Sequence, residues 1–182
     1  MTLNSWHRLL AVPVLVGAAS PAVAVNYLSA EQAQRALVPG AQSFEAYPVA
    51  LSKVQLKAIR SLAGTPQRNA NPKVWRAVSG GKTAGWVIVD EVIGKHEYIT
   101  YATAISPGGT VMGVEILSYR ETKGGEVRNP KWRGLFRGKK LSDAFKLNKD
   151  IPNISGATLS CRNITDGVKR LLALHHVALA GA

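Results

Sequence analysis

The chain has 182 residues, a formal net charge of +12 and a single cysteine, Cys161. This length suits one globular domain with a substantial hydrophobic core. A single cysteine excludes an internal disulfide, a zinc or iron–sulfur site built on several thiolates, and the two-thiol attachment of a c-type haem. Any redox chemistry must therefore use a cofactor of another kind.

The first 24 residues have the three parts of a secretory signal peptide. A short basic region ends at Arg8, an uncharged apolar run covers residues 9–19, and Pro21-Ala22-Val23-Ala24 provides the small-x-small pattern that signal peptidase cleaves. We predict a signal peptide over residues 1–24 and a periplasmic location. The alternative is a retained membrane anchor, because residues 9–26 carry no charge and approach the length that spans a bilayer.

After the signal peptide, residues 25–72 are predicted to be an N-terminal helical segment. Two capping boxes, Ser29-Ala30-Glu31-Gln32 and Ser52-Lys53-Val54-Gln55, predict a helix beginning at each. The second helix has an apolar face and is expected to end at Gly64, before Thr65-Pro66.

Residues 73–182 are predicted to form the main domain. Four runs rich in Val, Ile, Tyr and Trp predict β-strands, and the turns between them are too short for the crossover helices of a parallel sheet. From Thr158 the apolar residues recur with helical spacing. We therefore expect an α+β fold, an antiparallel β-sheet flanked by N-terminal helices and a long C-terminal helix. The four predicted strands are Lys73–Ser79, Gly85–Ile93, Glu97–Ile105 and Thr110–Tyr119.

Basic residues are concentrated between positions 120 and 149. Such a stretch can bind a phosphate-bearing cofactor, an acidic protein or an anionic membrane surface, or it can simply be a solvated surface. Export makes a nucleic acid the least suitable partner, and we predict none. The basic residues of this stretch are Arg120, Lys123, Arg128, Lys131, Arg133, Arg137, Lys139, Lys140, Lys146 and Lys149.

The segment Ser155-Gly156-Ala157-Thr158 lies where an extended stretch meets the long C-terminal helix. A helix N-terminus presents free backbone N–H groups and the positive end of its dipole, and both favour a phosphate. Gly156 and Ala157 allow close approach of the backbone, while Ser155 and Thr158 offer hydroxyl groups. The alternative is an ordinary N-cap in which a Ser or Thr side chain begins the helix.

These residues resemble the flavinylation motif of the FMN-binding domain family, which includes the covalent-flavin subunits of sodium-pumping NADH:quinone reductase and related redox complexes. The loop Glu121-Thr122-Lys123-Gly124-Gly125 is similar to a second family motif that lies close to the flavin. By this resemblance, FMN is joined to Thr158 through a phosphodiester bond that a separate flavin transferase forms. The resemblance assigns cofactor binding to Thr158, Ser155, Gly156, Ala157, Glu121, Thr122, Gly124 and Gly125.

The family resemblance implies an exported flavoprotein that relays electrons to or from a membrane-embedded redox partner. We expect an electron-transfer protein more than a stand-alone oxidoreductase, because the sequence contains no catalytic constellation and no metal-ligand spacing. The alternative is a secreted basic binding module for an anionic ligand, or for non-covalent FMN, without a redox role.

Several side chains have two interpretations. Glu121 either accepts a hydrogen bond from the flavin or pairs with a nearby Arg, and His96 either donates to flavin or phosphate or is an ordinary turn residue. Trp132 is a candidate for shielding the flavin or docking a partner. The strand aromatics are mainly core candidates, although one of them could stack on the isoalloxazine ring. These aromatics are Trp75, Trp86, Tyr98 and Tyr101.

Overall fold

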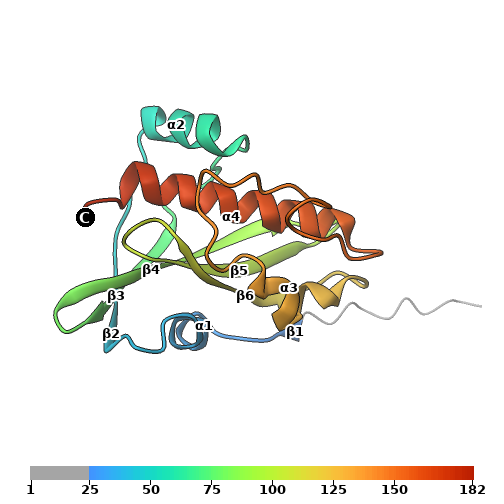
Figure 1. The fold of residues 1–182 in the computed structure, drawn as a ribbon, viewed down its shortest axis with the longest axis horizontal. Helices are drawn as coiled ribbons and strands as arrows, with labels where there is room; N and C mark the ends of the chain where they lie inside the picture. The colour runs from blue at the N-terminus through green and yellow to red at the C-terminus, as the bar shows by residue number, and fades with distance from the viewer. Residues whose placement is uncertain (1–24) are drawn as a thin grey trace, which may run out of the picture.

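A six-stranded sheet in the order β1-β6-β5-β4-β3-β2 organises residues 25–182, the part of the chain that the computed structural model describes. Every neighbouring pair of strands is antiparallel, and helices cover both faces (Figure 1). The α+β fold class is therefore confirmed. The predicted signal peptide lies outside the described residues.

The four predicted strands are present, and two further strands complete the sheet. β1 pairs with β6 and β2 pairs with β3, so both edges of the sheet come from the segment predicted to be helical. The sequence did not reveal them because β1 is two residues long and β2 is a mostly exposed edge strand without apolar alternation. The strands are β1 Val25–Asn26, β2 Ser43–Ala46, β3 Lys73–Ser79, β4 Lys82–Ile93, β5 Tyr98–Ile105 and β6 Val111–Tyr119.

Both capping boxes begin helices as predicted. The side chains of Ser29 and Ser52 accept from the backbone N–H groups of Gln32 and Gln55, each at 3.2 Å. The basic stretch after β6, for which no helix was predicted, contains two short helical turns, and the Asn129 side chain caps the second of them. The helices are α1 Ala30–Leu37, α2 Lys53–Ala63, the 3₁₀ turn η1 Gly125–Arg128, α3 Pro130–Gly134 and α4 Thr158–Ala178.

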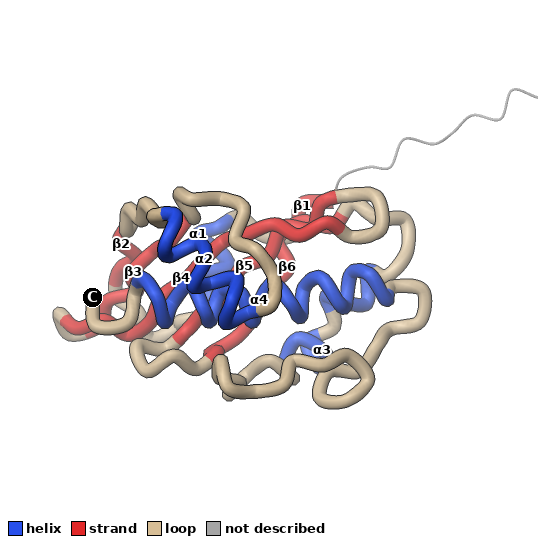
Figure 2. The backbone as a smooth tube through the Cα atoms, turned by 90° about the horizontal axis from the view of Figure 1, so that it is seen from above, coloured by secondary structure: helices blue, strands red, loops and turns tan. Residues whose placement is uncertain are grey.

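Successive side chains of each strand point to opposite faces of the sheet, and they form two hydrophobic cores, one on each face. On β4, Trp86 and Ile88 point into the core beneath α4, while Val87 points to the opposite face, beneath α1. The α1 face is lined by small residues such as Ala102 and Ala104 on β5. Helix α4 runs along the molecule when it is seen from above (Figure 2), and α2 packs on its outer side (Figure 1).

The approach of α4 to the sheet requires a glycine at position 167. A Cβ added at Gly167 would collide with the Tyr101 hydroxyl and lie 3.0 Å from its ring carbon Cζ. A larger residue here would push α4 away from β5.

None of the helices within residues 25–182 is long and apolar enough to cross a membrane.

The packing of α4 on the sheet predicts how substitutions change the free energy of unfolding. Ile88 is fully buried beneath α4, so I88A should lower the free energy of unfolding by about 2–5 kcal/mol through lost contacts and a residual cavity. Val54 is 78% exposed, and V54A should change it by less than about 0.5 kcal/mol. Urea denaturation measures both, and equal effects would contradict the described core.

Candidate functional site

The two predicted motifs meet at the N-terminal end of α4. Gly124 adopts a left-handed conformation with φ +89°, and a Cβ placed on it would collide with the Ala157 side chain and lie 2.6 Å from the Tyr119 hydroxyl. The loop after β6 therefore packs directly against the residue that precedes Thr158. Only a glycine fits position 124 without strain.

Tyr119, at the end of β6, ties this loop to α4. Its hydroxyl donates to the Lys123 carbonyl at 2.6 Å and lies 3.2 Å from the Ser160 hydroxyl, on the first turn of α4. Burial raises the pKa of Tyr119, and the nearby carboxylate of Glu121 adds to the rise, although the hydrogen bond with Ser160 opposes it. The phenol therefore remains a hydrogen-bond donor. Sequence reasoning treated this position only as the end of a strand.

Thr158 is the first residue of α4 and its side chain is exposed. Ala157 is the N-cap, and no side chain caps the helix, so the alternative of an ordinary Ser or Thr cap is wrong. The Thr158 hydroxyl oxygen accepts a hydrogen bond from the Asn153 side-chain amide at 3.0 Å. Both a hydroxyl group and the positive end of the helix dipole thus face solvent together.

The turn before α4 is exposed at Ser155 and Gly156, and Gly156 is left-handed with φ +79°. Trp132 fixes the chain just upstream, because its indole N–H donates to the Pro152 carbonyl at 2.9 Å. Only 5% of Trp132 is exposed, so its indole packs in the interior and anchors the motif segment. This role differs from the flavin shielding or partner docking considered from the sequence.

Glu121 lies at the same end of the molecule, but its carboxylate holds the turn between β4 and β5. Its Oε1 accepts from the backbone N–H groups of His96 at 2.6 Å and Glu97 at 3.0 Å. Desolvation acts to raise the pKa of Glu121, yet the backbone hydrogen bonds outweigh it and the pKa lies below its ordinary value. The contacts of Glu121 are thus with backbone amides, which neither interpretation of the sequence included.

The remaining predicted residues, Thr122 and Gly125, are both exposed on the loop beside Gly124. Arg162, which sequence reasoning did not single out, follows Thr158 by four residues and so lies on the same face of α4, where it is exposed. Its spacing from Thr158 was the only signal that could have found it.

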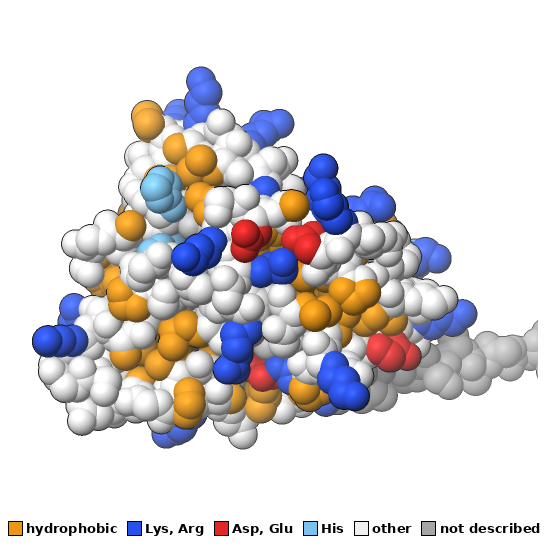
Figure 3. Space-filling view, in the orientation of Figure 1, with side chains coloured by type: hydrophobic (Ala, Val, Ile, Leu, Met, Phe, Trp, Pro, Cys, Tyr) orange, Lys and Arg blue, Asp and Glu red, His pale blue; other side chains and the backbone are white. Residues whose placement is uncertain are grey.

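Most of the basic stretch is exposed to solvent. Figure 3 shows lysines and arginines scattered over one face of the molecule. Arg133 and Lys139 are instead half-buried, and they form ion pairs with Glu115 and Asp150, respectively. The exposed members are Arg120, Lys123, Arg128, Lys131, Arg137, Lys140, Lys146 and Lys149.

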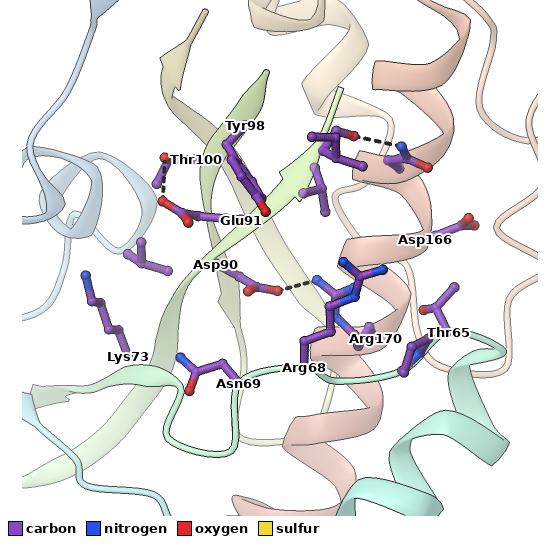
Figure 4. Close-up of a pocket in the computed structure, with 15 residues that line it drawn as sticks. Thr65, Arg68, Asn69, Lys73, Asp90, Glu91, Tyr98, Thr100, Asp166 and Arg170 are labelled. Atoms are coloured by element: carbon purple, nitrogen blue, oxygen red, sulfur yellow. Dashed lines mark hydrogen bonds and ion pairs between the residues drawn. The ribbon is translucent and has the colours of Figure 1, made fainter. Parts of the chain in front are cut away.

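A cleft of about 430 Å³ opens beside α4, between β4, the start of β5 and the loop that follows α2 (Figure 4). Arg170 of α4 donates to Asp90 of β4 at 2.5 Å inside it. The Arg170 Nε and the Thr65 hydroxyl are buried lining atoms without a hydrogen-bond partner among the described residues. The sequence did not indicate this cleft, because its parts come from three separate segments.

Both motifs lie within the segment that matches a known family of proteins. The family model for the FMN-binding domain matches residues 94–173. A component of the proton-translocating ferredoxin:NAD(+) oxidoreductase complex of Clostridium ljungdahlii is 31% identical over 137 residues, which cover 67% of this chain and 74% of that relative. The chain belongs to the FMN-binding domain family. The crystal structure of Shewanella oneidensis NqrC is similar with a TM-score of 0.49 and 18% identity, covering 82% of this chain and 76% of that one.

The residues present fit FMN. The uncapped N-terminus of α4 and the exposed Arg162 suit a phosphate, and the Gly124 loop allows the backbone to approach it. This member of the FMN-binding domain family therefore has groups that suit the phosphate end of the cofactor.

The loop contact predicts an ordered series of glycine substitutions. G124A should destabilise the fold by about 2 kcal/mol or more, because left-handed strain costs about 1–3 kcal/mol and the new methyl group collides with Ala157. G138A has the strain, with φ +83°, but nothing within 4 Å, and should cost about 1 kcal/mol. G125A should change the unfolding free energy by less than about 0.5 kcal/mol. Urea denaturation checks the order, and G124A at the level of G125A would contradict the contact.

Glu121 predicts a pH-dependent stability difference. Because the folded pKa lies below the ordinary value of 4.5, the charged carboxylate stabilises the fold fully above that value. The contribution is lost as the pH falls through the lower folded pKa. The unfolding free energy of the wild type should therefore exceed that of E121Q at neutral pH and converge on it in acid. A difference that persists unchanged in acid would refute the assigned role of the charge.

Proposed function

We propose that this protein is an electron carrier with FMN attached to Thr158 through a phosphodiester bond. The observation that carries the proposal is the exposed Thr158 hydroxyl at a helix N-terminus without a side-chain cap. A core threonine or a capping threonine would be occupied by the fold. Thr158 is instead open to a second protein, and its side-chain hydroxyl accepts a hydrogen bond from the side-chain amide of half-buried Asn153.

The surroundings of Thr158 favour the charge that attachment would bring. A phosphodiester carries a negative charge, which the dipole and the free N–H groups of the first turn of α4 stabilise. Arg162, one turn further along the same face, adds a positive charge. Gly124 has no side chain where the loop after β6 packs against Ala157, the residue before Thr158.

Attachment requires a flavin transferase and FAD as the donor. The Thr158 oxygen forms a bond to the phosphorus on the FMN side of FAD, the bond to the adenosine monophosphate group breaks, and the hydroxyl proton passes to a base of the transferase. Asn153 donates to the Thr158 oxygen and so orients the hydroxyl group without competing for its proton. No nucleophile-activating base from this chain is needed.

The partner in this proposal is a membrane redox complex. The relative in Clostridium ljungdahlii belongs to a complex named for ferredoxin:NAD(+) oxidoreduction and proton translocation. Bound FMN supplies one- or two-electron transfer, and this chain positions it and sets its environment. Export by residues 1–24 would place the carrier in the periplasm, beside such a complex.

Replacement of Thr158 tests the attachment. Protein exported from cells that contain a flavin transferase should carry the added mass of FMN minus water on the peptide that contains Thr158. T158A should lack this mass, while its unfolding free energy should fall by only about 0.5–1.5 kcal/mol, the value of one exposed hydrogen bond. S155A is the matched control and should retain the flavin.

Flavin that remains covalently bound in T158A would contradict the assignment and indicate Ser155 or Ser160. An unmodified wild-type protein, made beside an active transferase, would favour the basic binding module instead. In that case binding to an anionic ligand should fall steeply with salt concentration.

A further inference from the structure

We propose that the cleft beside α4 binds the C-terminal tail of a partner protein, which adds as a short antiparallel strand to an open edge of β4. The site is separate from the flavin attachment point. With 3.6 residues per turn, the cleft residues Asn163, Asp166 and Arg170 lie about 80–140° around α4 from Thr158. Binding at this cleft therefore does not depend on the flavin.

The last four residues of β4, 90–93, have a strand on one side only. β3 pairs with β4 as far as Lys73 opposite Val89, whereas β5 continues to Tyr98 opposite Ile93. Within residues 25–182, no strand lies against the other side of this stretch. At a rise of about 3.3 Å per residue, the stretch is an open sheet edge about 13 Å long.

Two residues of this stretch turn their backbone groups to the open side. The Gly94 N–H donates to the Glu97 carbonyl at 2.7 Å, which continues the ladder between β4 and β5 and fixes its phase. Because the hydrogen-bonded positions alternate along an antiparallel strand, Glu91 and Ile93 face away from β5. The Asn163 side-chain amide donates to the Ile93 carbonyl at 2.7 Å. The Glu91 N–H, the Glu91 carbonyl and the Ile93 N–H are left for a ligand.

The chain before β3 turns away from β4, which leaves the edge open. The Asn69 side chain accepts from the Asn71 backbone N–H at 2.9 Å. The Ala70 carbonyl accepts from the Leu51 backbone N–H at 2.8 Å. These contacts hold the segment against the residues that precede α2, so it does not extend the pairing with β4.

The start of β3 determines the direction and the end of the bound segment. A segment in line with β3 runs antiparallel to β4, from the Ile93 end of the cleft toward Asp90. Its last residue meets Lys73, where β3 itself takes over the pairing with β4. A chain that must stop at this point ends in a free carboxylate, so the site suits a C-terminal tail.

Hydrogen-bond donors gather at the end of the cleft where the tail stops (Figure 4). The Arg170 Nε and the Thr65 hydroxyl are buried there without a partner among the described residues. Arg68 and Lys73 are exposed beside them, and neither forms an ion pair within residues 25–182. A carboxylate satisfies the buried donors and is attracted by the two exposed charges.

The acidic residues of the cleft are compatible with a bound carboxylate. Asp90 is paired with Arg170. The Glu91 side chain accepts from the Thr100 hydroxyl at 3.2 Å and points to the face of the sheet opposite Asp90. Burial raises the pKa of Asp166, while the positive charges of its neighbours on α4 oppose the rise. The strand itself therefore separates Glu91 from the donors, and nearby cations offset the other two carboxylates.

The other end of the cleft is apolar. Tyr98 is 56% exposed and Ile93 is 41% exposed, and both line the cleft. They lie opposite each other on β5 and β4, so their side chains share one face of the sheet. An apolar side chain near the start of the bound segment would remove this surface from water. We thus expect a tail of about four residues, apolar at its start and ending in the carboxylate.

The outer edge of β6, on the far side of the sheet, is covered by the chain itself. β1 pairs with its last two residues only. Further upstream, Arg133 donates to the Val114 carbonyl at 2.7 Å, and Val111 exchanges two backbone hydrogen bonds with residues 138–139. Uncovered strand edges readily pair with another chain. The edge of β4, which has the Asn163 contact but no such cover, is the one that suits a partner.

A peptide library tests the tail site on the full exported chain. The probe is a library of N-acetylated tetrapeptides with free C-terminal carboxylates, and the control is the same library with C-terminal amides. Bound peptides are identified by mass spectrometry. Peptides that begin with an apolar residue should be enriched as carboxylates by about tenfold over their amides, because charged hydrogen bonds to the donors of the cleft are lost in the amides.

The best carboxylate peptide is then titrated against R68M and R60M. R68M should weaken binding about two- to fivefold, the effect of one exposed charge. R60M removes the same charge from the exposed surface of α2, outside the cleft, and should bind like the wild type. Both substitutions replace exposed residues, so the fold is expected to persist. Equal affinities of R68M and R60M would contradict the assigned position of the carboxylate.

Amide hydrogen exchange, followed by NMR, locates the bound segment. The peptide should slow exchange of the Glu91 and Ile93 amides by about tenfold or more, because both gain a hydrogen-bond partner. The Val92 amide faces β5 and is the internal control, since the ladder protects it with or without peptide. A ligand held by side chains alone would leave the exchange at Glu91 and Ile93 unchanged.

Each outcome decides the proposal. No enrichment from either library, or equal enrichment of carboxylates and amides, overturns the tail site. Carboxylate enrichment without slower exchange at Glu91 and Ile93 places the peptide elsewhere and also overturns it. Carboxylate preference, weaker binding by R68M and protection of the two amides together establish it. The flavin mass on Thr158 is measured independently, so the carrier function can fail while the tail site holds, and the reverse.

Discussion

The packing of α4 across β4 and β5 is the constraint on which the rest of the structure depends. Its buried face carries Ile164, Val168 and Leu171, all fully buried over the central strands. Gly167 sets how closely the helix approaches the sheet. Because the helix packs on the sheet along its length, its first residue, Thr158, has a fixed position near the end of β6. A small change in this packing would move Thr158 away from the loop that supports it.

At that point, structural and chemical roles are divided among neighbouring residues. Tyr119 and Gly124 close the contact between loop and helix, Glu121 holds the β4–β5 turn, and Trp132 anchors the chain before the motif. These side chains are used by the fold itself. Thr158 is therefore left with its hydroxyl exposed, and the helix N-terminus is left uncapped, which is the arrangement that attachment of a phosphate group requires.

The N-terminal segment contributes more than a spacer to this domain. It supplies both edge strands of the sheet, and the loop after α2 forms one wall of the cleft beside α4. The family match begins at residue 94, so this wall belongs to the part of the chain outside it. The matched region therefore contains both motifs, while the segment before it completes the sheet and one wall of the cleft in this chain.

The sequence by itself determined the elements whose signals are local. Runs rich in Val, Ile, Tyr and Trp identified four strands, the capping boxes identified α1 and α2, and the small residues before Thr158 marked the start of α4. The edge strands β1 and β2 were missed, because short, exposed strands carry no apolar pattern and exist through pairing with β6 and β3. Only the tertiary structure decided that Gly124 meets Ala157, that Glu121 binds backbone amides and that Tyr98 stays outside the core. It also created the cleft from three distant segments. Local patterns specify which element a residue forms, whereas contacts between elements arise from packing and leave no periodic signal in the sequence.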